Sequence, residues 1–259
     1  MPLFVSTMPL WLATLVIVVL PTMIAMAGPV FIRRRITLER LTTNNEIAGF
    51  KFATVGVIYA VLIAFAVIVV WERFNDGEVA VLQEAGAAAT LYRLTTDPIP
   101  DLAATRKALD RYLKLVIERD WPRMAEEKGS TEVTRSLDFL YASTMRLADK
   151  GLLAPSILSE LFKQLDVITQ ARRTRLQLAS GIVPDILWAA LFIGAFLTIG
   201  FTFFFGTENL SAQVLMTGIL SVIVFTGLLV IVSIDHPFAG AVHIDNDPLQ
   251  KVLDDFSDR

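Results

Sequence analysis

The stretch FKFATVGVIYAVLIAFAVIVVW, residues 50–71, decides the fold class of this chain. From residue 52 to residue 71 it contains no charged side chain. A helix rises about 1.5 Å per residue, so about 20 apolar residues cross the roughly 30 Å hydrocarbon core of a bilayer. Residues 50–71 are therefore predicted to form a transmembrane helix.

Three further uncharged runs occupy residues 1–32, 186–207 and 209–234. Each is long enough to cross a membrane, whereas a core helix of a soluble protein rarely needs that length. Only 19% of the residues are charged and 54% are hydrophobic, compared with about a quarter charged in an average soluble domain. The predicted fold class is an all-α membrane protein with four transmembrane helices and a helical extramembrane domain inserted between spans 2 and 3.

The predicted domain boundaries follow from these runs. Ala25-Met26-Ala27 is similar to a signal-peptide cleavage site, but no Lys or Arg precedes residue 33, so span 1 is predicted to stay uncleaved. The four predicted parts are residues 1–71 with spans 1 and 2 (about 8–32 and 50–71), the helical domain 72–183, residues 184–234 with spans 3 and 4, and the acidic C-terminal tail 235–259.

Within residues 72–183, helix ends can be predicted from caps and breaks. The Pro-rich stretch 97–100 predicts a stop, with Asp101 as the N-cap of the next helix. Gly129-Ser130-Thr131 is predicted to supply the next break and cap, Lys150-Gly151 a helix end, and Pro155-Ser156 the start of another helix.

The membrane orientation does not follow from charge. Four spans place both termini and residues 72–183 on one side, and the two short links on the other. Five basic residues lie near the span ends on each side, so the positive-inside rule gives a tie. They are Arg33, Arg34, Arg35, Arg40 and Lys51 on the link side, and Arg73, Arg172, Arg173, Arg175 and Lys251 on the domain side.

Catalytic patterns are sparse. The chain has no cysteine, and no Gly-rich phosphate loop, nucleophile elbow or basic nucleic-acid-binding pattern occurs in it. His236 and His243 could be drawn with Asp235, Asp245 and Asp247 as a metal site, but a solvated acidic turn is the preferred interpretation. We therefore predict no enzyme, no cofactor, no metal and no nucleic-acid partner. The span centres lack acids and histidines, which also argues against a proton-coupled transporter.

Span 2 is the most patterned segment. Small residues recur on one face at spacings that let helix backbones approach closely in lipid. Large apolar residues lie on the other face, where they could meet lipid or form a hydrophobic ring that gates a pore by dewetting. The predicted helix-packing residues are Gly49, Ala53, Gly56, Ala60 and Ala64. The candidate pore-lining residues are Ile58, Val61, Leu62 and Phe65, with Lys51 as a candidate for the pore mouth.

Residues 45–62, which begin with the lead-in NEIAGF, resemble the bacterial bestrophin-like membrane proteins long filed as a domain of unknown function, DUF4239. The resemblance runs over about residues 45–250. Its other elements are Glu84-Ala85, Tyr92-Arg93, Trp121-Pro122, Pro184 with Trp188, and the post-span turn Asp235-His236-Pro237-Phe238-Ala239-Gly240.

A more distant resemblance connects the chain to bestrophin anion channels, which are pentamers whose pore neck lies on the second span. Their post-span Asn-Pro-Phe-Gly turn is similar to residues 236–239. Their dense acidic calcium clasp is not matched by the sparser Asp245-Asn246-Asp247. Two alignments of the neck stay open, one on Gly56, Ala60 and Ala64 and the other on Val57, Val61 and Phe65.

The resemblance implies a homo-oligomeric ion channel, pentameric by analogy, that conducts small inorganic anions through a lipid bilayer with span 2 nearest the axis. It also implies a bacterial inner-membrane location with the helical domain and both termini in the cytoplasm. The alternative is a non-conducting membrane scaffold or signalling protein whose helical domain binds a partner. A membrane-embedded metalloenzyme is a third class, and it requires His236 and His243 to converge on one metal.

Overall fold

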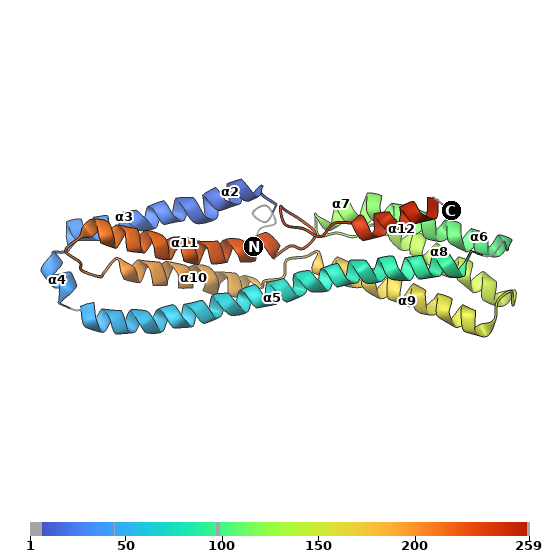
Figure 1. Ribbon diagram of the computed structural model, residues 1–259, viewed down its shortest axis with the longest axis horizontal. Helices are drawn as coiled ribbons and strands as arrows, with labels where there is room; N and C mark the ends of the chain where they lie inside the picture. The colour runs from blue at the N-terminus through green and yellow to red at the C-terminus, as the bar shows by residue number, and fades with distance from the viewer. Residues whose placement is uncertain (1–6, 44, 97–98, 258–259) are drawn as a thin grey trace. The chain divides into compact units, whose positions relative to one another are not determined.

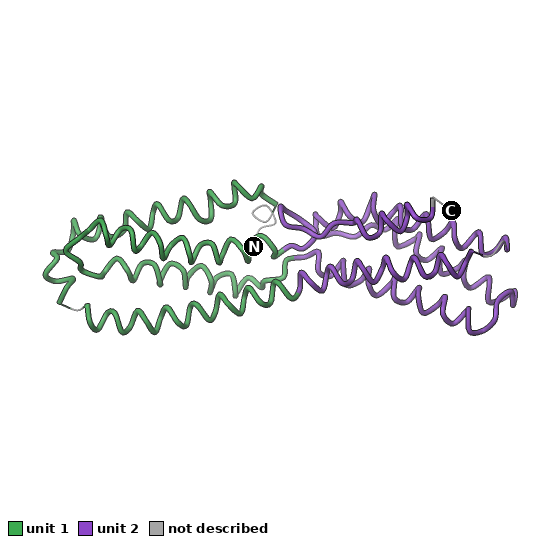
Figure 2. Tube along the Cα trace, viewed as in Figure 1, with its two compact units in different colours: residues 1–72, 181–235 green, residues 73–180, 236–259 purple. Residues whose placement is uncertain are grey.

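The computed structural model describes residues 7–43, 45–96 and 99–257, and over these residues it is helical with no strand. The chain divides into two compact units (Figure 2). The first comprises residues 1–72 and 181–235, and the second comprises residues 73–180 and 236–259. The four-span, all-α fold class predicted from the uncharged runs is confirmed.

The first unit contains four helices long and apolar enough to cross a membrane. Span 1 covers Leu10–Arg35 and span 2 is the first part of α5 (Asn45–Leu94). Spans 3 and 4 are α10 (Asp185–Thr202) and α11 (Leu210–Ile234). As Figure 1 shows, these helices lie alongside one another, and the short helix α4 (Leu38–Thr42) lies in the first link.

Span 1 changes its helical pitch before a proline. It consists of α2 (Leu10–Thr14), the π-helical turn η1 (Leu15–Val19) and α3 (Leu20–Arg35). Pro21 is the second residue after η1. Its ring can neither donate a hydrogen bond nor fit against the carbonyl one turn earlier. A wider turn at that point removes the clash while the helix continues.

The second unit is a helical bundle built around the C-terminal part of α5. Its helices are α6 (Pro100–Leu115), η2 (Val116–Asp120), α7 (Trp121–Met124), α8 (Thr131–Asp149), α9 (Pro155–Leu178) and α12 (Asp247–Ser257). One apolar cluster joins them: Leu91 of α5, Leu109 of α6, Leu140 of α8 and Leu165 of α9 are all fully buried. Leu249 of α12 belongs to the same cluster, so this helix of the C-terminal tail packs on the core.

Most predicted helix ends in this unit are confirmed. Ser130 is the N-cap of α8, and its hydroxyl accepts a hydrogen bond from the Glu132 amide at 3.3 Å. Gly151 follows α8 with a φ of +61°, and α9 begins at Pro155. The predicted capping role of Asp101 is wrong, because Ile99 is the N-cap of α6 and the Asp101 carboxylate binds Lys150 at 2.7 Å. Residues 97 and 98 of the predicted stop lie outside the described residues.

Candidate functional site: the α5 face and the contacts that hold it

Within the first unit, α5 packs through one narrow side. Tyr59, Ala66 and Val70 are buried there, and the Tyr59 hydroxyl donates a hydrogen bond to the Leu191 carbonyl of α10 at 3.0 Å. The Tyr59 ring lies over Gly194, where an added Cβ would approach the ring to 2.4 Å. The missing side chain of Gly194 is therefore what lets α10 accept this aromatic ring.

The rest of α5 is largely uncovered in the subunit. Only 17% of its most apolar window is buried, compared with 28% in span 1 and 33% in each of the other two spans. Its exposed large residues include Phe50 at 78%, Val57 at 64% and Ile68 at 51%. An apolar helix exposed over so much of its circumference is covered by other protein or by lipid.

The structure separates the four candidate pore-lining residues. Ile58, Val61 and Phe65 lie on the uncovered surface, with exposures of 66%, 48% and 64%. Leu62 is half-buried on the border of the packed side. Lys51 is exposed two turns before this group.

The predicted helix-packing stripe has few close neighbours inside the subunit. Ala53, Ala60 and Ala64 are exposed, whereas Gly49 and Gly56 are half-buried. An added Cβ at Gly56 would meet nothing within 4 Å, and one at Gly49 would meet only the Phe205 ring, at 4.0 Å. The packing role of this stripe, toward whatever partner covers it, stays a prediction.

The N-terminal end of α5 is fastened to the link between spans 3 and 4. The Asn45 side chain accepts a hydrogen bond from the Gly206 amide at 2.9 Å and donates one to the Gly206 carbonyl at 2.6 Å. An added Cβ at Gly206 would approach the Thr42 amide nitrogen to 2.6 Å. Arg33, at the end of span 1, also donates to the neighbouring Thr207 carbonyl. Residue 206 must therefore be a glycine for these two links to meet.

The post-span turn begins with a buried cap. The Asp235 carboxylate accepts hydrogen bonds from the amides of Ile182 and Val183 at 3.1 and 2.8 Å. These amides lie just before α10, so Asp235 joins the end of span 4 to the start of span 3. Asp235 is fully buried and His236 is 1% exposed, so the interpretation as a solvated turn is wrong for both.

The remainder of the turn packs inside the second unit. His236 Nε2 lies 3.1 Å from Glu127 Oε1, and Glu127 has a left-handed backbone with a φ of 62°. Phe238 is buried with its ring edge-on to Trp121, at a centroid distance of 5.8 Å. His243 is exposed and lies 3.1 Å from Asp245. Within the described residues no three His, Asp or Glu side chains gather as a metal site would require, so the two histidines do not converge.

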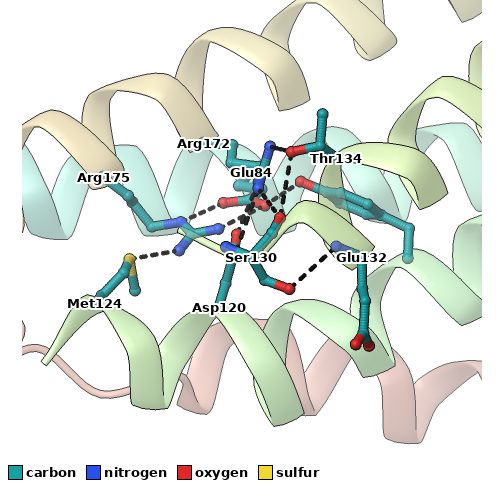
Figure 3. Close-up of polar contacts among 9 residues, drawn as sticks. Glu84, Asp120, Met124, Ser130, Glu132, Thr134, Arg172 and Arg175 are labelled. Carbon is teal, nitrogen blue, oxygen red and sulfur yellow. Dashed lines mark hydrogen bonds and ion pairs between the residues drawn. The ribbon is translucent and has the colours of Figure 1, made fainter. Parts of the chain in front are cut away.

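The helical domain contains a buried ion pair that sequence analysis did not identify (Figure 3). Arg175 Nε donates to Glu84 Oε2 at 2.6 Å, and its Nη2 donates to Oε1 at 3.1 Å. The Tyr112 hydroxyl donates to the same carboxylate at 2.7 Å. The Arg175 guanidinium also lies 4.9 Å from the centre of the Trp121 ring. One carboxylate therefore connects α5 with α6 and α9.

This pairing changes the ionisation of its members. Burial raises the pKa of Tyr112 well above its usual range, and the adjacent Glu84 carboxylate raises it further. Burial alone would lower the pKa of Arg175, but the Glu84 carboxylate more than offsets it, and the pKa is raised. Arg175 stays charged and Tyr112 stays protonated at neutral pH.

A second buried pair lies close by in Figure 3. Arg172 Nε donates to Asp120 Oδ2 at 2.7 Å, and Asp120 Oδ1 accepts from the Ser130 amide at 2.7 Å. Arg172 also donates to the Ser130 carbonyl and the Thr134 hydroxyl. The π turn η2 ends at Asp120, just ahead of Pro122, so this carboxylate is held where the helix pitch changes.

The fold and the span pattern define a four-span helical membrane protein with a helical domain inserted between spans 2 and 3. The chain belongs to the family of the Bestrophin-like domain, which matches residues 19–249. Among solved structures, a bacterial bestrophin homologue from Klebsiella pneumoniae with a mutation matches at a TM-score of 0.72 and 14% identity. That match covers 92% of this chain and 96% of the homologue.

The structure of the same homologue solved by Zn-SAD phasing matches at a TM-score of 0.68, also at 14% identity and with the same coverage. No curated protein matches the sequence significantly. At these identities the structural likeness establishes a shared fold.

Proposed function

We propose that this protein is a homo-oligomeric, anion-selective ion channel with α5 nearest the symmetry axis. Membership of the Bestrophin-like family supports the channel class. Four spans whose centres carry no charged residue make a poor ion pathway within one subunit. Assembly of identical subunits around an axis is the natural way to enclose a pore.

The observation that carries the proposal is the small covered fraction of α5. Only 17% of its apolar window is buried, the lowest of the four spans. In a ring of subunits, the uncovered apolar side would face the axis. The small residues Ala53, Ala60 and Ala64 would let a neighbouring subunit approach closely.

Within α5, Val57, Val61 and Phe65 are the residues proposed to form the narrowest part of the pore. They recur every fourth residue, and all three are exposed in the subunit. Ile58 borders the same surface, so it is proposed to stand beside the ring. A ring of such side chains closes a pore when water leaves it and conducts when water enters.

Lys51 is proposed to lie at one mouth of this pore. It is exposed and lies on α5 before the proposed ring. A cationic side chain repeated in every subunit would concentrate anions at the mouth, because several like charges act on one small volume. This arrangement supports anion over cation selectivity.

The helical domain and both termini are proposed to lie in the cytoplasm of a bacterial cell. The native chain has no cysteine, so single cysteines can be placed without competing thiols. A thiol reagent that does not cross membranes should label Thr43→Cys in the link in intact cells, and Glu126→Cys only after permeabilisation. The reverse pattern would place the domain outside.

The proposal is tested by oligomeric state and conductance measured on the same purified preparation. Native mass spectrometry should show a closed ring, a pentamer by analogy. In planar bilayers under a chloride gradient, the reversal potential of the current should lie close to the equilibrium potential of chloride. A monomer or dimer without conductance would favour a membrane scaffold whose helical domain binds a partner. A ring that passes cations would retain the channel class and refute the selectivity.

A further inference from the structure

A surface hollow of about 360 Å³ lies between α6 and α8 in the helical domain. This volume lies within the range of small-molecule binding pockets. Neither the proposed pore nor the two buried ion pairs use the side chains of its wall. The wall is formed by Arg111 and Leu115 of α6 and by Glu132, Arg135, Ser136 and Phe139 of α8.

The wall residues of each helix lie on one helical face. Arg111 and Leu115 are four residues apart on α6, a spacing that makes them neighbours on the helix surface. The wall positions of α8 are 132, 135, 136 and 139, and steps of three and four also select one face. Behind the wall, Leu113 of α6 and Leu137 of α8 are buried in the apolar cluster. The two helices are therefore held in place without an occupant of the hollow.

Two cations of the wall are accessible and unpaired. Arg111 and Arg135 are both exposed, and neither guanidinium forms a hydrogen bond or ion pair with any residue that the structure describes. A single exposed arginine normally indicates only a solvated face. Here two arginines from different helices border one hollow, so one anion inside it can bind both. The planar guanidinium matches the oxygens of a phosphate group and binds them through paired, charge-assisted hydrogen bonds.

The acid in the wall has a cation of its own. Glu132 Oε2 lies 3.7 Å from Arg119 Nε, and Arg119 does not line the hollow. With Glu132 compensated in this way, the two wall arginines leave two positive charges without a counter-charge. A phosphate monoester carries about two negative charges near neutral pH, whereas a carboxylate or a sulfonate carries one. The charge of the wall therefore favours a phosphate monoester.

An aromatic ring makes up another part of the wall. Phe139 is 52% exposed, and the Arg146 guanidinium lies 5.7 Å from the centre of its ring. Leu115 is half-buried and adds apolar surface on the α6 side. Aromatic rings pack favourably in offset-stacked or edge-on arrangements. A flat apolar group attached to the phosphate would therefore find a surface of its own.

We propose that this hollow binds a small phosphate monoester with an aromatic organic group. The phosphate accepts hydrogen bonds from Arg111 and Arg135, and the ring lies against Phe139 and Leu115. The site does not rest on the proposed channel function, because none of its residues belongs to a membrane span. It would stand even if the protein formed no pore.

The test uses the full chain in a neutral detergent at pH 8, where a phosphate monoester is a dianion. The probe is 4-fluorophenyl phosphate, and 4-fluorobenzenesulfonate serves as a matched probe with the same ring and a single charge. Fluorine NMR line widths measure the binding of each probe, with empty micelles as the blank. The phosphate should bind at least about tenfold more tightly than the sulfonate, because it engages both guanidinium groups.

Four variants locate the binding. Arg111→Gln and Arg135→Gln should each weaken the binding of the phosphate probe at least about tenfold, the loss expected for a charge-assisted hydrogen bond. Arg123→Gln is the matched control, because it removes an exposed arginine of α7 that does not line the hollow, and it should bind as the wild type does. Phe139→Ala should weaken the binding of the phosphate probe while leaving that of inorganic phosphate unchanged.

All four substituted side chains are exposed, and circular dichroism with size-exclusion elution checks that each variant is folded. Equal binding of the two fluorinated probes by the wild type would overturn the proposal without reference to any variant. Equal weakening by Arg123→Gln would also overturn it, because the attraction would then come from the charge of the whole domain. Line widths of the phosphate probe that match those in empty micelles would overturn it as well.

Discussion

Glu84 on α5 and Arg175 on α9 form an ion pair from which solvent is fully excluded. The Arg175 Nε to Glu84 Oε2 distance is 2.6 Å, and both side chains are 0% exposed. The two residues are 91 positions apart in the chain, so the pair forms only when α5 and α9 pack in one register. Removing one partner would leave the other charge buried without compensation.

Glu84→Gln should therefore destabilise the helical domain by about 3–5 kcal/mol, the usual cost of breaking a buried pair. Denaturant unfolding followed by circular dichroism measures the change. Asp101→Asn is the matched control, because it breaks the partly exposed Asp101–Lys150 contact at 2.7 Å. That control should cost at most about 1 kcal/mol. If Glu84→Gln and Asp101→Asn lowered the free energy of unfolding equally, the buried pair would be no more important for stability than the partly exposed one.

Tyr112 should make stability pH-dependent at high pH. Its pKa in the folded protein is raised well above its usual value of 10.0, so the unfolded chain loses this proton first. The protonated Tyr112 hydroxyl therefore contributes to the free energy of unfolding. This contribution is complete below about pH 10 and is lost as the pH rises through the pKa of Tyr112 in the folded protein. Between these two values the wild-type free energy of unfolding should fall more steeply than that of Tyr112→Phe, by about 1.4 kcal/mol per pH unit.

The measurement is denaturant unfolding of both proteins at a series of pH values from 9 upward. Tyr112→Phe also removes the hydrogen bond to Glu84, so it should be less stable near neutral pH while showing the flatter slope. Parallel pH profiles would mean that neither burial nor the Glu84 carboxylate raises the pKa of Tyr112 in the folded protein.

Gly206→Ala should destabilise the transmembrane unit. An added Cβ would approach the Thr42 amide nitrogen to 2.6 Å, which forces the two links apart and strains the Asn45 hydrogen bonds. Overpacking of this kind costs about 1–3 kcal/mol. Gly200→Ala is the matched control, since a Cβ there meets nothing within 4 Å and alanine favours the helix by up to about 1 kcal/mol.

Melting temperatures of the purified variants in one detergent decide between these outcomes. The Gly206→Ala protein should melt below the wild type, and the Gly200→Ala protein should melt at or above it. A Gly206→Ala protein as stable as the wild type would mean that the two links do not depend on this close approach.

The transmembrane spans were predictable from the sequence because each is a continuous run of residues without charge. Charge-free runs such as residues 209–234 are visible in the chain itself, as are local caps such as Ser130. The buried pairs were not predictable, because Asp120 and Arg172 lie 52 residues apart and neither stands in an unusual local sequence. Their only signal was the presence of charged residues on amphipathic helices, which normally indicates a solvated face.

The post-span turn illustrates the same limit. The order Asp235-His236-Pro237-Phe238 identified a notable turn, but burial of the first two residues depends on partners distant in the sequence. These are the amides of residues 182 and 183 for Asp235, and Glu127 for His236. Composition alone favoured a solvated turn there, whereas the tertiary structure encloses it.

The proposed channel with α5 at its axis is tested most directly by thiol modification during bilayer recording. Phe65→Cys places the chain's only cysteine on the exposed face of α5, and Ile223→Cys places it on the exposed face of α11, where the native residue is 65% exposed. We predict that a charged, membrane-impermeant methanethiosulfonate reagent changes the anion current through Phe65→Cys at least severalfold and leaves that through Ile223→Cys unchanged. Current altered only in Ile223→Cys, or purified wild-type protein without conductance under any gradient, would contradict the account.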